Sequence, residues 1–273
     1  MRKLLIALAA ALTAFVGFLV SPLSTSLPDT VFLSEMTWLE VEEAMRQGKT
    51  GVIVPTAGLE QNGVHAVLGK HRYIVRHTAE RIARTLRTAL VAPVIDYVPE
   101  GDIEPPSGHM RFTGTISISP SLFGQILEST ARSLRAHGFE RIYFLGDSLG
   151  NQKPQAEVAA KLNREWTNET TRVLHIGDYY AKNGQLEWLK AKGETEFSIG
   201  GHAGIRDTSE LLAIRPDGVR PYMIRPRGGL HLGVTGASGD AAKASAKIGQ
   251  RMIDLKVEAA LRQIRELNAA KIR

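Results

Sequence analysis

Apolar residues fall into short continuous runs and longer amphipathic stretches that alternate along the chain. Short continuous apolar runs are typical of strands that are buried on both faces of a parallel sheet. Such runs occupy residues 51–55, 90–95, 141–145 and 171–176. Apolar residues at helical spacing, helped by start signals such as Ser119 before Pro120, predict helices over residues 37–47, 72–86, 119–138, 155–166 and 239–268.

The alternation of strands and helices predicts the fold class. It indicates a single α/β domain over residues 27–273, with three αβα layers and a mainly parallel sheet. Polar loops begin at Thr56, Asp96 and Gly146, each just after a predicted strand. Because ligands bind beyond the carboxyl ends of the strands in open parallel sheets, we expect these loops to converge on one site.

Residues 1–26 have the pattern of an export segment rather than of the domain. Arg2 and Lys3 precede an apolar run over residues 4–20, and small residues such as Ser24 and Ser26 follow it. A positive start, an apolar run and small residues are typical of a secretory signal peptide. The run is also close to the length of a membrane span, so an uncleaved N-terminal membrane anchor is the alternative. Both interpretations predict a periplasmic or secreted domain.

Composition and charge narrow the chemistry. The chain has no cysteine, which excludes disulfides, thiolate metal ligands and a cysteine nucleophile. The formal net charge of +6 comes from basic residues spread along the chain without a dense block. Spread charge of this kind is typical of a solvated surface, so we expect no nucleic-acid partner.

Several polar loops resemble the signatures of one enzyme family. Residues 58–71 (GLEQNGVHAVLGKH) are similar to the Gly-Ser-x-Glu-Gln-His-Gly-Pro-His-Leu-Pro-Leu-Gly-Thr-Asp signature of the creatininase (creatinine amidohydrolase) family. Residues 108–115, 146–151, 202–209 and 233–236 follow in the order of the family's later motifs. The resemblance covers residues 37 to about 264 and implies the creatininase-like αβα fold.

The resemblance also implies a chemistry, because this family uses two divalent metals and a bridging water to attack a cyclic amide or related carbonyl. Carried over by position, the ligand set is mostly replaced. Glu60 is kept, but Asn62 stands for a ligand histidine, His71 for the bridging aspartate and Ser148 for another histidine. Gly150 stands where creatininase has a ligand glutamate. A neutral imidazole offers one lone pair to one cation, which argues against the ordinary two-metal site.

A reduced metal site is what the remaining residues predict. We expect one divalent ion, zinc or manganese, with Glu60, His71 and Asp147 as ligands. The alternative is a hydrogen-bonded pair of Glu60 and His71 that holds no metal. We also expect the loop that carries these residues to face solvent, so that replacing His71 would change the fold little.

The other polar residues of these loops are candidates for catalysis and substrate binding. His202 and Asp207 stand where the family has residues that shape substrate binding and proton transfer, and His65 is a further catalytic candidate. The remaining candidates are expected to contact a small-molecule substrate, and they are Asn62, His109, Ser148 and Asn151.

Three functions remain open at this point. The first is an exported hydrolase that acts on the C–N bond of a cyclic amide, a lactam or a similar carbonyl compound. The second is a binding protein that keeps the pocket and has lost catalysis. The third is a serine hydrolase that uses Ser148, whose Gly-Asp-Ser-Leu-Gly setting resembles a nucleophile elbow. By resemblance to the family, we expect a homo-oligomer, often a hexamer.

Overall fold

A computed structural model describes residues 27–224 and 232–269. The predicted signal peptide or anchor at residues 1–26 lies outside the described residues. Within them, no helix is both long and apolar enough to cross a membrane.

Four parallel strands form the sheet, in the order β2-β1-β3-β4. They are β1 (Gly51–Thr56), β2 (Ala89–Val91), β3 (Arg141–Gly146) and β4 (Arg172–His175). All six residues of β1 are buried, as the continuous apolar run predicts for a central strand. Gly51 pairs with Ala89 on one side and with Arg141 on the other, which fixes the register.

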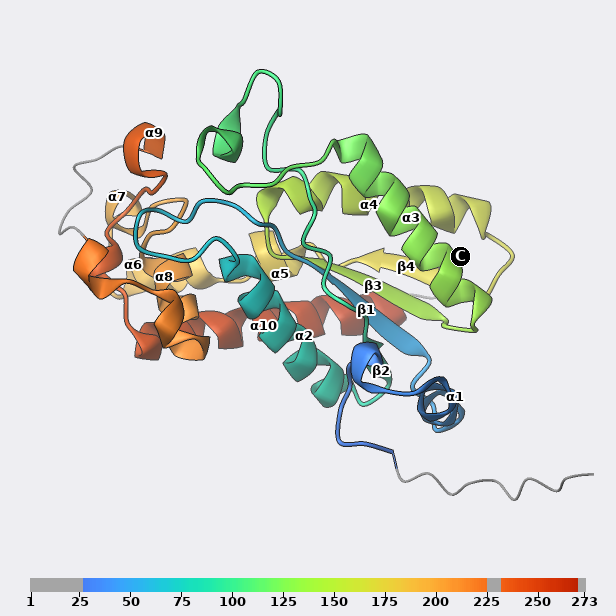
Figure 1. Cartoon of the computed structure of the whole chain (residues 1–273). Coiled ribbons are helices and arrows are strands. Elements are labelled where there is room, and N and C mark those ends of the chain that lie inside the picture. Colours follow the sequence, from blue (N-terminus) through green and yellow to red (C-terminus); the bar gives the residue numbers. More distant parts are fainter. Residues whose placement is uncertain (1–26, 225–231, 270–273) are drawn as a thin grey trace, which may run out of the picture.

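Helices cover both faces of the sheet, which confirms the predicted αβα domain (Figure 1). One apolar core lies between the sheet and α2 (Lys70–Leu86), α5 (Asp178–Ala181) and α10 (Ala246–Ala269). The other lies between the sheet and α3 (Pro120–Ala136) and α4 (Leu149–Glu165), and α1 (Trp38–Arg46) packs into it through Ala44.

The remaining short helices lie in the segments that join these elements. The α-helices are α6 (Gln185–Ala191), α7 (Glu196–Ile199), α8 (Ile205–Ile214) and α9 (Leu232–Thr235). The 3-10 helices are η1 (Leu33–Glu35), η2 (Gly108–Arg111), η3 (Pro216–Gly218), η4 (Pro221–Met223) and η5 (Ala241–Lys243). Helix α8 packs on α10 beside the sheet and places its first turn near the strand ends.

Two helices begin several residues away from their predicted starts. The predicted loop 146–151 is wrong at its end, because α4 already begins at Leu149, directly after Ser148. Asn151 lies in its first turn and donates from Nδ2 to Thr56 Oγ1 (2.7 Å), which ties the helix start to the end of β1. The C-terminal helix begins at Ala246 rather than at Gly239, because η5 precedes it.

The strand order explains where the loops meet. The chain leaves β1 to one side toward β2 and returns to the other side at β3, so the order reverses between β1 and β3. Open parallel sheets bind ligands at this reversal, beyond the carboxyl ends of the two strands. Glu60 follows β1 and Asp147 follows β3 at this place.

Candidate active site

A cavity of about 700 Å³ opens beyond the carboxyl ends of β1 and β3. Glu60, His109, Asp147 and His202 all line it, and they come from four separate segments of the chain. Glu60 Oε1 lies 3.6 Å from His202 Nδ1, so the predicted convergence of the loops is observed. The volume is within the range of small-molecule pockets.

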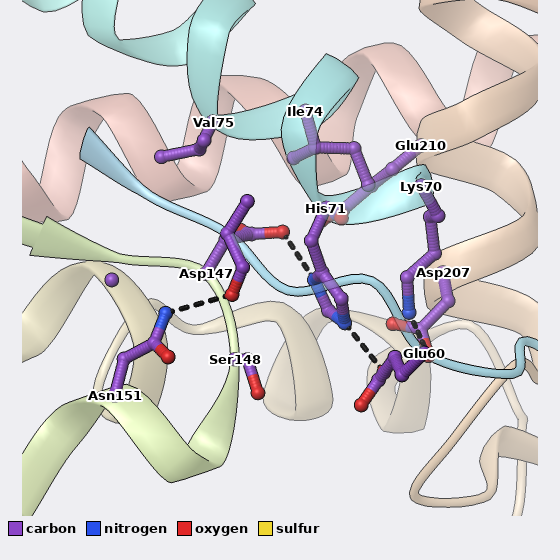
Figure 2. A network of polar contacts seen from close by, with 12 residues as sticks. Glu60, Lys70, His71, Ile74, Val75, Asp147, Ser148, Asn151, Asp207 and Glu210 are labelled. Carbon is purple, nitrogen blue, oxygen red and sulfur yellow. Dashed lines mark hydrogen bonds and ion pairs between the residues drawn. The ribbon is translucent and has the colours of Figure 1, made fainter. Parts of the chain in front are cut away.

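His71 joins two buried carboxylates at the bottom of the cavity (Figure 2). Its Nδ1 donates to Asp147 Oδ2 and its Nε2 donates to Glu60 Oε1, both at 2.7 Å. Burial and the charge of Lys70 lower the pKa of His71, but the two carboxylates outweigh them and raise it. Since both ring nitrogens donate, neither offers a lone pair to a metal in this arrangement. The geometry is that of the hydrogen-bonded alternative, now extended to Asp147.

The site of His71 corrects one expectation from the sequence. His71 lies in the first turn of α2 and is buried, not in a solvent-facing loop. The helix begins at Lys70, two residues earlier than the pattern predicts, and this turn aims His71 between the ends of β1 and β3.

Lys256 supplies a second buried cation next to Asp147. Its Nζ lies 2.7 Å from Asp147 Oδ1 and 3.0 Å from Glu210 Oε2. The Tyr179 hydroxyl also donates to Asp147 Oδ1, at 2.7 Å. Burial raises the pKa of Asp147, but Lys256 and His71 outweigh burial and lower that pKa to about 2. Asp147 is therefore an ionised carboxylate whose oxygens are used by three side chains.

A second cluster lies on the other side of Glu60. His109 Nε2 is 3.3 Å from Glu60 Oε2, and ligand atoms of Glu60, His109 and His202 all lie within 4.8 Å of one another. His202 donates from Nε2 to the carbonyl oxygen of Gln61 (2.8 Å), which leaves the Nδ1 lone pair toward Glu60. Burial lowers the pKa of His202 to about 4, so this imidazole is neutral. A neutral histidine whose other nitrogen is fixed by a carbonyl is a typical metal ligand.

Gln61 fixes the proton position on His109. The backbone N–H of Gly63 donates to Gln61 Oε1 (2.9 Å), so the other end of the amide donates from Nε2 to His109 Nδ1 (2.7 Å). The neutral ring then carries its proton on Nε2, facing Glu60. Glu60 and His202 can bind an ion directly through free lone pairs, whereas His109 must first give up its Nε2 proton.

Asp207 lies at the rim of the cavity, in the first turn of α8. Its Oδ2 accepts from the backbone N–H of Ala203 (2.6 Å) and lies 3.2 Å from Lys70 Nζ. Burial raises the pKa of Asp207, but Lys70 and Arg206 outweigh it and hold the pKa well below its usual range. The carboxylate thus both holds the turn before α8 and pairs with a buried lysine.

Several predicted site residues lie behind the cavity wall. His65 donates from Nε2 to Thr208 Oγ1 (2.9 Å) and is buried away from the cavity. Asn62 donates to the carbonyl oxygens of Glu60, Val67 and Leu68 and so holds its own loop together. Asn151 holds the start of α4 in the same way, so both amides bind the backbone and not the cavity.

Ser148 lines the cavity beside a carboxyl group rather than a histidine. Its neighbour is Glu100, and in the described part of the chain no imidazole hydrogen-bonds to the Ser148 hydroxyl. Burial and the charge of Glu60 raise the pKa of Glu100 to about 10, so Glu100 is a neutral acid. A serine nucleophile needs a base within hydrogen-bond reach, and the described residues place none there.

Four residues of the cavity with basic or carboxyl side chains are absent from the sequence prediction, namely Lys70, Glu100, Arg206 and Lys256. Lys256 carried a signal, because it interrupts the apolar stripe of α10 between Ile253 and Ala260. The other three lie in polar segments, where a charged side chain is unremarkable.

Comparison with known proteins gives the family of this fold and site. The family model for creatininase (creatinine amidohydrolase) matches residues 34–264, which is most of the chain. The chain belongs to the creatininase family. A creatinine amidohydrolase of Pseudomonas putida is 24% identical over 255 residues, which cover 87% of this chain and 97% of that protein.

Solved creatininase structures have the same fold. A manganese form has a TM-score of 0.73 at 23% identity and covers 87% of this chain and 98% of its own. A mutant creatininase of the Zn–Zn type has a TM-score of 0.72 at 23% identity, covering 88% and 98%. Solved structures of the family thus include zinc and manganese forms.

The residues of this chain fit one ion and not the family's pair. At the family's ligand positions, His71 contacts Glu60 and Asp147, Asn62 is turned into its loop, and Ser148 offers only a hydroxyl. Lys256 also contacts Asp147. The set Glu60, His109 and His202 has the carboxylate and imidazole donors that suit zinc or manganese.

Proposed function

We propose that the chain is an exported hydrolase that cleaves the C–N bond of a small cyclic amide or similar carbonyl compound, with one divalent ion instead of two. The observation that carries the proposal is the cluster of Glu60, His109 and His202 in the cavity beyond the strand ends. Family membership supports the reaction class, and the replaced ligands support the single ion.

Each side chain of the cluster has a distinct task in this proposal. Glu60 and His202 would hold the ion, and the ion, when bound, would acidify a water and polarise the substrate carbonyl. Gln61 holds His202 and His109 in fixed orientations through its carbonyl oxygen and its amide. His109 carries an Nε2 proton directed at Glu60, from which it can hydrogen-bond a bound oxygen.

Metal content and hydrolysis together test the proposal. Purified protein, loaded with zinc or manganese and then desalted, is analysed for bound metal and assayed against a panel of lactams, hydantoins and lactones. We expect close to one ion per chain, and Glu60→Gln and His202→Ala should lose both the ion and the activity. His137→Ala replaces an exposed histidine at the end of α3 and should keep both.

A second candidate is a binding protein without catalysis. The observation in its favour is that His71 and Lys256 already neutralise Glu60 and Asp147, so the cavity holds together without an ion. Ligand binding with no metal and no turnover of any compound in the panel would favour this reading and refute the hydrolase.

Export and assembly are further parts of the proposal. Residues 1–26 support export, and cell fractionation with N-terminal sequencing tests it: full-length protein in the cytosol would refute it. The family resemblance supports a homo-oligomer, often a hexamer, and light scattering of the purified protein would measure its mass.

A further inference from the structure

The charged side chains that line the cavity form pairs. Lys70 lies 3.2 Å from Asp207, His71 lies 2.7 Å from Glu60, and Lys256 lies 2.7 Å from Asp147. In each pair a basic group faces a carboxylate at short distance, so the pair adds little net charge to the cavity.

Arg206 lines the same cavity and has no such partner. Within residues 27–224 and 232–269, its guanidinium forms no hydrogen bond or ion pair with another side chain. It extends from the first turn of α8, one residue before Asp207, and its charge acts on both Asp207 and Tyr180. A guanidinium has five N–H donors in a planar fork, so this side chain presents unused donors to whatever fills the cavity.

Two further donors surround this position. The ammonium of Lys70 is 1% exposed, has its single ion pair with Asp207, and finds no hydrogen-bond acceptor in the described residues. Tyr180 also lines the cavity, and its hydroxyl has no hydrogen-bond partner among the described residues. A buried donor without an acceptor, such as the Lys70 ammonium, is rare in folded proteins, which indicates that a ligand oxygen completes it.

We propose that Arg206, Tyr180 and Lys70 form an anion subsite, and that the substrate is a cyclic amide that bears a carboxylate. The amide part rests on the proposed function, whereas the anion part rests on this subsite. The carboxylate binds the planar fork of Arg206, and the amide ring reaches toward Glu60 and His202.

The charge of the cavity selects a carboxylate over a phosphate ester. Apart from the ion proposed at Glu60 and His202, the three pairs leave one positive charge in the cavity, that of Arg206. A monoanionic carboxylate balances this charge. A phosphate monoester near neutral pH carries about −1.5 to −2 and would place the excess negative charge beside Asp207.

The test compares a ring that carries an acid with the same ring that carries an amide. Binding of 5-oxoproline and of 5-oxoprolinamide is measured by titration calorimetry on the metal-loaded protein, alongside the hydantoin-5-acetate pair. We expect each acid to bind roughly ten- to hundredfold more tightly than its amide, as a charge-assisted bidentate contact provides. Arg206→Gln should remove this preference and weaken the binding of the acids far more than that of the amides.

Two variants make the result specific. Arg206→Lys keeps the charge without the fork and should recover part of the preference for the acids. Arg265→Gln removes an exposed arginine of α10 and should change nothing. Thermal unfolding of Arg206→Gln checks that the variant is folded.

The outcomes separate this inference from the proposed hydrolysis. If the acids bind preferentially, the preference depends on Arg206 and no compound is turned over, the subsite is supported and the hydrolase is refuted. Turnover of the neutral amides with equal or better binding than the acids would overturn the subsite and leave the hydrolase standing. Failure of every acid in the panel to bind, or an equal loss of both members of a pair in Arg206→Gln, would also overturn the subsite.

Discussion

Replacing His71 by alanine should destabilise the protein strongly. The side chain donates to Glu60 and to Asp147, both at 2.7 Å, and both carboxylates are 2% exposed. In the variant Asp147 keeps Lys256 and Tyr179, but Glu60 loses its only close cationic partner among the described residues. Removing one partner of a buried ion pair destabilises by about 3–5 kcal/mol, because the remaining charge is left without compensation.

The matched control lies on the same helix. His77 is a half-buried residue of α2, and in the described residues it forms no hydrogen bond or ion pair. His77→Ala should therefore lower the free energy of unfolding by about 1 kcal/mol or less. Both variants are compared with the parent protein by urea unfolding, after chelation so that metal binding does not contribute.

The pH dependence of the difference gives a second readout. The pKa of His71 is raised in the folded protein, so its contribution is complete below the ordinary value of 6.5 and is lost as pH rises through the raised value. The pKa of Glu60 is lowered, so its contribution is present above the ordinary value of 4.5. The loss of unfolding free energy in His71→Ala should therefore be largest between pH 4.5 and 6.5. It should become smaller at alkaline pH. A deficit no larger than that of His77→Ala, or one that grows with pH, would refute the pairing.

Two other predictions follow from the geometry. Gln61→Glu places an acceptor opposite His109 Nδ1, frees Nε2 for an ion, and should tighten zinc binding about tenfold; the gain should vanish when His109→Ala is added, as competitive titration would show. Lys256→Met should lower the free energy of unfolding by about 3 kcal/mol, since it removes a buried partner of Asp147. Lys247→Met, an exposed change in the same helix, should lower it little, and equal losses would contradict the buried pair.

The sequence was sufficient for the sheet and for the place of the site. In an αβα domain, a continuous apolar run such as residues 51–55 is buried on both faces only at the centre of a parallel sheet. Parallel strands end at the same edge, so the loops that carry Glu60 and Asp147 had to meet there. Both inferences rest on local pattern and elementary topology, and neither requires knowledge of side-chain contacts.

The local sequence pattern did not predict the backbone conformation where tertiary contacts determine it. Residues 149–154 contain Gly150 and Pro154, which disfavour a helix. The structure nevertheless begins α4 at Leu149, because Asn151 and Gln155 donate to Thr56 at the end of β1 and anchor the first turns. These bonds connect residues far apart in sequence, so no window of the sequence contains them.

Side-chain partners were the part that the sequence could not supply. Lysines are ordinarily solvated, and Lys70 and Lys256 are buried only because α2 and α10 cross the strand ends beside Asp207 and Asp147. The candidate ligands Glu60 and His71 were chosen because they stand at ligand positions of the family. Such positions indicate where a residue lies but not which side chain it contacts. The structure shows that these two side chains bond each other at that place.

The centre of this protein therefore differs from its relatives in the source of its positive charge. In solved relatives, zinc or manganese occupies the centre. Here His71 and Lys256 contact the carboxylates Glu60 and Asp147, and each is covalently part of a helix that packs against the sheet. Charges that belong to the fold cannot dissociate, so we expect the architecture around the cavity to hold without metal. An ion held by Glu60 and His202 would then be needed for the reaction but not for stability. The stability of the fold would be independent of the metal content, unlike in a protein whose two metals also hold its core together.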